Sequence, residues 1–144
     1  MNDTDGIWHG YDQAGLDDQY KASGTRIRDP QAWLDNWRAR GQALRASSAN
    51  RLDMRFGPHA EEHYDVFLAA RPKAPLHVFL HGGYWYSMTS KEFSFVAKGI
   101  VESGMVAVVM NYALCPHVTM TELVRQVRAG LAHVHLHARD YGAD

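Results

Sequence analysis

The stretch from Pro75 to Trp85, PLHVFLHGGYW, constrains the fold of this chain more than any other. Its first part, Leu76–Leu80, is a short apolar run of the kind that forms a buried strand. The run breaks at once into His81-Gly82-Gly83, where two glycines let the backbone turn sharply and approach another group closely. Taken alone, Gly-Gly after a strand also fits an ordinary turn, so the flanking sequence has to decide between the two interpretations.

The flanking segments predict a sheet around this strand. Residues 52–56 and 64–68 alternate between apolar and polar side chains, which indicates two strands of an antiparallel hairpin around the turn at residues 57–59. Residues 105–110, MVAVVM, have the composition of a fully buried strand. A helix with a capping box from Thr89 to Glu92 should lie between the strand at 76–80 and this one, ending at Gly104. The result is a βαβ unit with a parallel pair.

Two further helices are expected. Asp29 has the character of an N-cap and Pro30 that of a first helical residue, and the helix they start should run to about Ser47. A last helix should extend from about Met120 to Ala138. Its apolar stripe consists of Leu123, Val124, Val127, Leu131 and Val134.

Length and composition place these elements in one domain. The chain has 144 residues, and we expect a wrapping segment over residues 1–28 and a single domain portion over residues 29–144. A net charge of −1 gives no reason to expect nucleic acid as a partner. The single cysteine, the absence of a signal-peptide pattern and the absence of a long apolar run favour a cytoplasmic protein with no membrane span.

In its details the sequence resembles the kynurenine formamidase (arylformamidase) group of α/β-hydrolases. The resemblance covers nearly the whole chain and rests on HGGYW, Lys91, Gly104–Val109, Asn111–Pro116, Leu16–Tyr20 and Arg55–Pro58. It implies the α/β class and the amino-terminal half of the α/β-hydrolase fold, a mixed, mostly parallel sheet with flanking helices, without the half that carries the nucleophile elbow.

The resemblance also implies a function. Such enzymes hydrolyse aryl formamides, as in the conversion of N-formyl-kynurenine to kynurenine and formate in tryptophan catabolism, through a Ser-His-Asp triad and an acyl-enzyme. Hydrolysis of small esters, as by a carboxylesterase, is the alternative, and no cofactor or metal is implied. In this family the oxyanion hole is formed by the loop His81, Gly82, Gly83, Tyr84 and Trp85. The N–H groups of Gly83 and Tyr84 are the expected donors, with His81 as organiser of the loop.

The aromatic run Tyr84, Trp85 and Tyr86 admits two interpretations. These side chains could line an aromatic substrate pocket, or they could simply pack, because aromatic residues fill cores as readily as sites.

The sequence departs from the family in one large respect. The nucleophile motif G-x-S-x-G is absent from the 144 residues, and the family order Ser, Asp, His places all three triad members beyond Asp144. We therefore expect the chain to supply the oxyanion half of a hydrolase and to be inactive alone. A non-catalytic remnant that binds a ligand or partner is the alternative. The unpaired edge at residues 76–80 favours self-association, such as a homodimer.

Other candidate residues have ordinary structural explanations. Ser87 and Ser90 follow the loop, but Ser90 lies within the capping sequence, and a lone Cys115 is more often packed than catalytic. His133 and His137 share a helix face that His135 does not, which indicates a solvated surface rather than a metal site. His77 is expected to be a hydrogen-bonded interior histidine, and Asp65 a structural carboxylate.

Overall fold

The computed structural model describes residues 7–20 and 27–144. The chain divides into two units, residues 1–35 and residues 36–144. The first unit contains helix α1 (Gln13–Tyr20), at whose start the Asp12 carboxylate accepts a hydrogen bond from the Gly15 N–H. It also contains the first turns of α3 (Pro30–Ser47). The wrapping role expected for residues 1–28 stays a prediction, and residues 1–6 and 21–26 lie outside the described residues.

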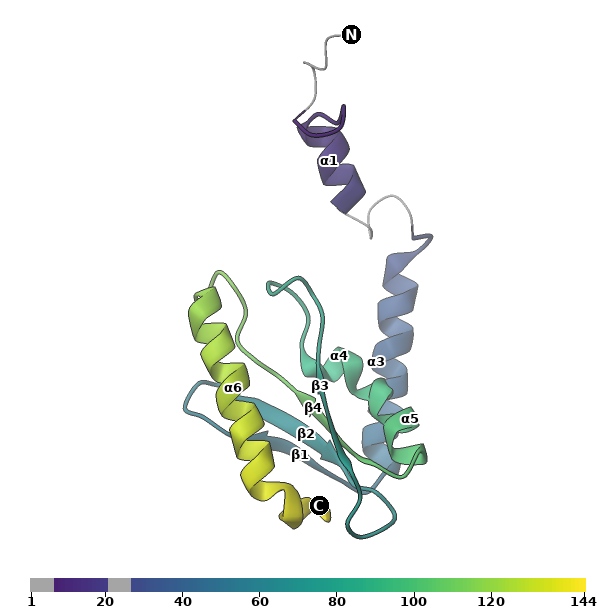
Figure 1. Cartoon of the computed structure of the whole chain (residues 1–144). Coiled ribbons are helices and arrows are strands. Elements are labelled where there is room, and N and C mark those ends of the chain that lie inside the picture. Colours follow the sequence, from purple (N-terminus) through teal and green to yellow (C-terminus); the bar gives the residue numbers. More distant parts are fainter. Residues whose placement is uncertain (1–6, 21–26) are drawn as a thin grey trace. The chain divides into compact units, whose positions relative to one another are not determined.

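The second unit is built on a four-stranded sheet in the order β1-β2-β4-β3 (Figure 1). Its strands are β1 (Asn50–Arg55), β2 (His63–Phe67), β3 (Leu76–Leu80) and β4 (Val106–Met110). The β1–β2 hairpin and the parallel β3–β4 pair are both confirmed. The sheet is mixed, as expected, but parallel pairing does not predominate among these strands, because the hairpin joins β4 through an antiparallel β2.

The two strands of the parallel pair differ in burial. β4 is buried along its whole length, which agrees with its continuous apolar sequence. β3 lies at the edge of the described sheet and has a neighbour only on the β4 side. His77 on β3 is therefore exposed, and the prediction of an interior histidine there is wrong. The unpaired edge expected at residues 76–80 is present, and the interior prediction for His77 did not take it into account.

The three helices expected from the sequence begin where it indicated, whereas α1 was not predicted. The Asp29 side chain caps α3 by accepting from the Ala32 N–H at 3.0 Å. The capping box is also present, with the Thr89 N–H donating to Glu92 at 2.8 Å. The helix that follows is interrupted, since a 3₁₀ turn, η1 (Ser94–Val96), separates α4 (Ser90–Phe93) from α5 (Ala97–Glu102). The last helix is α6 (Met120–His137), which continues into the 3₁₀ turn η2 (Ala138–Tyr141).

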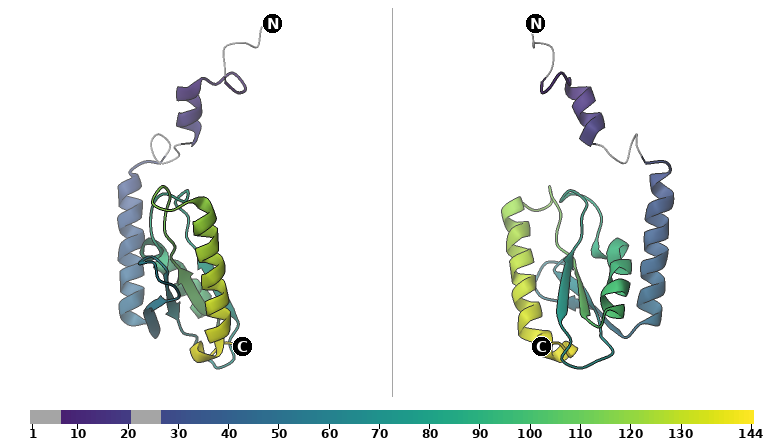
Figure 2. Two further views of the ribbon diagram at one scale, coloured as in Figure 1. Left: turned by 90° about the vertical axis from the view of Figure 1, so that its left-hand side faces the viewer. Right: turned by 45° about the vertical axis from the view of Figure 1, so that its right-hand side comes forward.

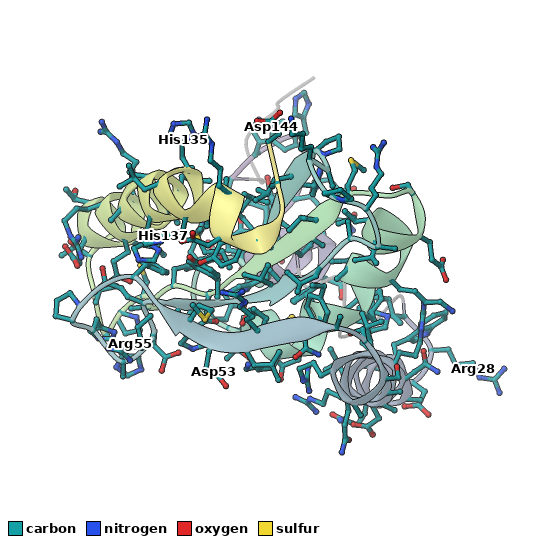
Figure 3. The ribbon with its side chains drawn as sticks, turned by 90° about the horizontal axis from the view of Figure 1, so that it is seen from below. Arg28, Asp53, Arg55, His135, His137 and Asp144 are labelled. Atoms are coloured by element: carbon teal, nitrogen blue, oxygen red, sulfur yellow. The ribbon has the colours of Figure 1, made fainter. Side chains whose placement is uncertain are left out.

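The sheet separates two apolar cores. Figure 2 shows α6 and α5 on opposite faces of the sheet. On one face α6 covers β2 and β4, and Val134 packs with Tyr64, Val108 and Met110. On the other face α5 and the part of α3 after Asn36 cover the same strands, with Ala97 against Val109. Figure 3 looks along the sheet and shows α6 and α3 on its opposite sides, with Asp53 and Arg55 on the outer strand β1.

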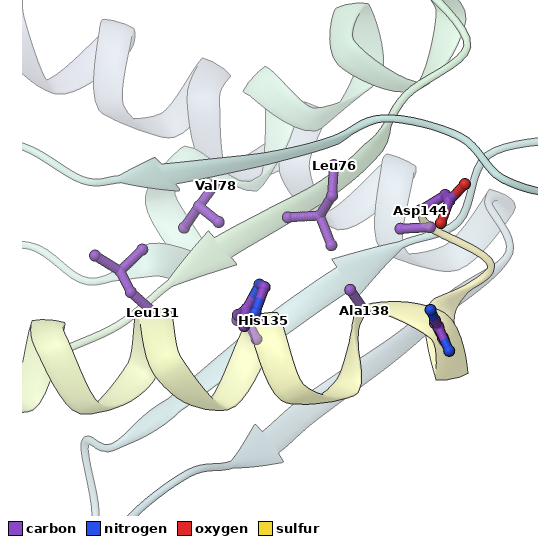
Figure 4. A pocket seen from close by; sticks show the side chains of 9 residues that line it. Leu76, Val78, Leu131, His135, Ala138 and Asp144 are labelled. Carbon is purple, nitrogen blue, oxygen red and sulfur yellow. The ribbon is translucent and has the colours of Figure 1, made fainter.

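The apolar stripe of α6 is only partly covered. Leu123 and Val134 are buried, whereas Val124 and Leu131 are exposed. Beside Leu131 a groove of about 480 Å³ runs between α6 and the edge strand β3 (Figure 4). Leu76 and Val78 form its other wall.

Candidate functional site

The candidate site is the loop of residues 81–89, here called the HGGYW loop, which joins β3 to α4. Because β3 and β4 are parallel neighbours, their carboxyl ends meet at one edge of the sheet. The segment after β4, beginning at Asn111, therefore lies beside the HGGYW loop. Ligand sites of open α/β sheets form at this edge, outside the carboxyl ends of the strands.

The backbone of the HGGYW loop is left-handed over three consecutive residues. Gly83, Tyr84 and Trp85 have φ angles of 124°, 57° and 64°. A Cβ atom on Gly83 would lie 1.9 Å from the carbonyl oxygen of Ser87, so only glycine fits there. At Tyr84 and Trp85 the left-handed conformation costs about 1–2 kcal/mol each. Strain of this kind is concentrated at active sites and ligand clamps.

The turn is closed through one carbonyl, and among the described residues the N–H groups of Gly82, Gly83, Tyr84 and Trp85 have no acceptor. The Gly83 carbonyl oxygen accepts from the Ser87 N–H at 3.1 Å, from the Ser87 hydroxyl at 2.8 Å and from the Tyr86 N–H at 3.3 Å. By contrast, within residues 7–20 and 27–144 no group accepts a hydrogen bond from the N–H of Gly83 or Tyr84. The loop therefore holds adjacent backbone donors, those of Gly83 and Tyr84 among them, that are available to an anionic or carbonyl oxygen.

His81 anchors the start of the loop. Its ring is buried and stacks on Tyr112, with the ring centroids 4.2 Å apart and the planes 3° from parallel. Its Nδ1 lies 2.7 Å from the Gly82 carbonyl oxygen. A carbonyl can only accept, so Nδ1 carries the hydrogen and Nε2 is left as an acceptor. Burial lowers the pKa of His81, which keeps the ring neutral near pH 7.

The three aromatic side chains of the loop are not part of a core. Tyr84, Trp85 and Tyr86 are 65%, 50% and 65% exposed. They contact one another, with the Tyr84 and Trp85 rings 5.4 Å apart. Interior packing is therefore wrong as their explanation, because most of each ring remains accessible.

The serines and the cysteine do not form a nucleophilic site. Ser90 is fully buried, so no substrate reaches its hydroxyl. The Ser87 hydroxyl donates to the Gly83 carbonyl and stabilises the turn. Among the described residues no histidine hydrogen-bonds to either serine. Cys115 is half-buried, and its backbone N–H donates to the Trp85 carbonyl at 2.8 Å.

The histidines of α6 are divided between two environments. His133 is half-buried and its Nδ1 lies 2.8 Å from the hydroxyl of the buried Tyr64, so the prediction of a solvated surface is wrong for this residue. Its neighbour on the same face, His137, contacts Asp140 at 2.9 Å, and His135 is exposed. In the part of the chain that the structure describes, no group of three or more ligating side chains is arranged to hold a metal ion.

Lys91, one of the residues that carried the resemblance, has a structural partner. Its ammonium lies 2.8 and 2.9 Å from the two carboxylate oxygens of the fully buried Asp65. It also reaches Asp53 at 2.7 Å, and this hydrogen bond holds the pKa of Asp53 below its ordinary value. Asp65 is thus the structural carboxylate expected at this position, and it ties α4 to β2.

One contributor to the site was not identified from the sequence. The Asn111 carboxamide oxygen accepts from the Ser90 N–H at 2.9 Å, and its nitrogen donates to the Glu61 carboxylate at 2.7 Å. Two signals were available: Asn111 begins one of the segments that carry the family resemblance, and it directly follows β4, so it lies at the same sheet edge as the HGGYW loop.

Across residues 7–20 and 27–144, the helices lack the combination of length and apolar character that crossing a bilayer requires.

Comparison with known sequences identifies relatives over much of this unit. Residues 64–144 match the BD-FAE family. A kynurenine formamidase of Danio rerio is 33% identical over 95 residues, which are 65% of this chain and 32% of that protein. A kynurenine formamidase of Drosophila melanogaster is 37% identical over 75 residues, 51% of this chain and 25% of that protein. The chain thus spans about a third or less of these two relatives.

Solved structures share the fold. A candidate thioesterase from a Silicibacter species superposes with a TM-score of 0.76 at 27% identity, covering 81% of this chain and 45% of that protein. Esterase B of Lactobacillus rhamnosis, in complex with an inhibitor, superposes with a TM-score of 0.63 at 18% identity, covering 79% of this chain and 40% of that protein. The α/β-hydrolase fold expected for the amino-terminal half is therefore confirmed.

Proposed function

The chain belongs to the BD-FAE family of α/β-hydrolases, and from that premise we propose that it is the oxyanion-binding part of a serine hydrolase. The observation that carries the proposal is the left-handed turn at Gly83 and Tyr84, whose two N–H groups have no acceptor among the described residues. Backbone donors arranged in advance of the reaction stabilise the charge that develops on a carbonyl oxygen during acyl transfer. The turn at the end of β3 supports this role, because three hydrogen bonds to the Gly83 carbonyl oxygen close it.

The substrate class is proposed from the relatives and from the loop. Two relatives are kynurenine formamidases, which supports hydrolysis of an aryl formamide to an aryl amine and formate. The exposed rings of Tyr84, Trp85 and Tyr86 stand next to the proposed donors and offer an aromatic surface for such a substrate. Hydrolysis of small esters is the second candidate, and the shared fold with esterase B is consistent with it.

The nucleophile, base and orienting carboxylate are proposed to come from sequence that follows Asp144 in the same reading frame. Acyl transfer needs all three close to the oxyanion donors, and no G-x-S-x-G motif occurs in the 144 residues. The first step is therefore to sequence the coding DNA downstream of Asp144. An in-frame G-x-S-x-G supports the hydrolase proposal, whereas a stop codon directly after Asp144 favours a non-catalytic ligand-binding protein.

The proposal is tested by replacing Gly83 in the full in-frame product. A Val side chain at this position collides with the Ser87 carbonyl and displaces the two donors. Gly83→Val should lower turnover of an aryl formamide or activated aryl ester by roughly 10²–10³-fold, the usual loss for one oxyanion donor. Gly99→Val is the matched control, because an added side chain at Gly99 meets open space on α5.

Turnover and the free energy of unfolding are measured for both variants. The expected result is a large loss of turnover for Gly83→Val alone, with both proteins folded. Full turnover by a folded Gly83→Val protein contradicts the oxyanion role of this loop.

A further inference from the structure

The segment that follows β4 contacts the HGGYW loop at three separate points. It reaches the start of the loop through Tyr112, the middle through Cys115 and the end through Asn111. These contacts join residues more than 20 positions apart in the sequence, so they belong to the tertiary structure rather than to the loop itself. We call residues 111–115 the clamp segment.

Tyr112 holds the start of the loop in two ways. Its hydroxyl donates to the His81 carbonyl oxygen at 2.5 Å, and its ring stacks on the His81 ring. Both side chains are buried, so water does not compete for this hydrogen bond. The position of the His81 carbonyl determines the direction in which the chain leaves β3.

Asn111 holds the other end, and its orientation is determined by Glu61. A carboxylate can only accept a hydrogen bond, so Glu61 Oε2 fixes the Asn111 Nδ2 on its own side. The Asn111 Oδ1 is then directed to the Ser90 N–H at 2.9 Å. This bond fixes the first residue of α4, where the loop ends.

The middle of the loop is held by backbone. The Cys115 N–H donates to the carbonyl oxygen of Trp85 at 2.8 Å. Trp85 is one of the two strained aromatic residues that follow Gly83. A conformation of this cost persists only where surrounding contacts determine it. The clamp segment supplies such contacts at both ends and at the centre.

We propose that Asn111 and Tyr112 are positioning residues that hold the Gly83 and Tyr84 N–H groups in the geometry needed for catalysis. This inference rests on the proposed oxyanion role of the loop. Neither side chain needs to touch the substrate. Displacement of a catalytic group by about 1 Å can cost roughly 10²-fold in rate. Loss of one of three contacts should displace the loop part of the time and lower kcat more than it raises KM.

The central variant is Tyr112→Phe, which removes the hydroxyl and keeps the ring on His81. Its matched control is Tyr141→Phe, which removes a buried hydroxyl that bonds to Tyr64 at 2.8 Å, on the α6 side of the sheet. In the full in-frame product, Tyr112→Phe should lower kcat about tenfold with KM within about twofold. Tyr141→Phe should leave both constants unchanged. Asn111→Ala is a second variant with the same expected effect as Tyr112→Phe.

Hydrogen–deuterium exchange of the loop provides a readout that does not depend on activity. One hydrogen bond contributes about 0.5–1.5 kcal/mol, so exchange of the two hydrogen-bonded loop amides, those of Tyr86 and Ser87, should rise about 2- to 10-fold in Tyr112→Phe. Tyr141→Phe should leave these amides unchanged. Equal exchange in the two variants contradicts the positioning role proposed for the clamp segment, whether or not the protein is a hydrolase.

The kinetic data separate the two proposals. If Gly83→Val loses turnover while Tyr112→Phe behaves like Tyr141→Phe, the clamp is wrong and the oxyanion proposal stands. If Tyr112→Phe increases loop exchange but Gly83→Val keeps full turnover, the oxyanion proposal is wrong. The catalytic positioning role is then wrong as well, because it rests on that proposal. Loss of kcat and faster loop exchange together in Tyr112→Phe support the clamp.

Discussion

At the scale of single residues, burial changes the chemistry of two histidines. Burial lowers the pKa of His81 beneath the HGGYW loop. Burial and the neighbouring His137 lower the pKa of His133 on α6. Both residues are therefore neutral in the folded protein near pH 7. His81 hydrogen-bonds to the adjacent residue Gly82, whereas His133 contacts Tyr64 on a distant part of the chain.

These shifts predict that the protein loses stability in acid. The unfolded chain takes up a proton at the ordinary histidine pKa of 6.5, whereas folded His133 does so only at lower pH. Between those two values the unfolded state carries more protons, so the free energy of unfolding falls as pH drops below 6.5. The stability that neutral His133 contributes is fully present above that pH. Urea unfolding between pH 5 and 8 measures it.

A variant isolates the contribution of His133. His133→Gln retains a hydrogen-bond acceptor for Tyr64 and cannot titrate, so it should flatten the pH dependence. His135→Gln, on the same helix but exposed, should leave the dependence as it is. An unchanged pH dependence in His133→Gln contradicts the assignment.

At the scale of elements, the approach of α6 to the sheet depends on a glycine. A Cβ atom on Gly130 would lie 2.7 and 2.8 Å from the Sδ and Cε atoms of Met110 and 3.1 Å from Phe56. Met110 is fully buried, so its side chain has little space into which to move. The absence of a side chain at Gly130 therefore permits the close packing of α6 on β4.

Alanine at two helical glycines should have opposite effects. Gly130→Ala should destabilise the protein by about 1–3 kcal/mol, because overpacking outweighs the better helix propensity of alanine. Gly99→Ala on α5 meets no other atom and should stabilise the protein by up to about 1 kcal/mol. Chemical denaturation of both variants measures the difference. A stabilising Gly130→Ala substitution means that Met110 repacks freely.

At the scale of the whole sheet, the two edges differ. The β3 edge adjoins the apolar groove beside α6, and Leu80 on β3 is 42% exposed. The opposite edge is β1, where Leu52 is 38% exposed and a bulge interrupts the pairing with β2. A regular edge strand next to an apolar surface invites pairing with a second strand, whereas a bulge discourages it.

The 144-residue chain is therefore expected to self-associate through β3. Sedimentation velocity over a concentration series should show reversible association of the unmodified chain. Leu80→Lys should shift it towards monomer, because a charge on an edge strand opposes pairing. Leu52→Lys is the matched control and should have no effect. A monodisperse monomer at all concentrations contradicts this expectation.

Local sequence was sufficient to predict most of the elements. The capping box at Thr89, the N-cap at Asp29 and the buried run before Met110 depend on neighbours within a few residues, so their patterns are visible without a fold. The same holds for the HGGYW motif, because a glycine pair after a strand is a local signal. These patterns predicted the hairpin, the parallel pair and the position of the candidate loop.

Contacts between distant segments decided the rest. His77 is exposed because β3 is at an edge, and His133 is half-buried because Tyr64 lies beneath it, which no local pattern indicates. Asn111 and Tyr112 act on a loop more than 20 residues away. The sequence by itself determined the helices, the strands and the glycine turn, since these follow from short-range sterics and hydrogen bonding. Only the tertiary structure decided which side chains hold that turn, because their partners meet only when parallel β3 and β4 bring their ends together.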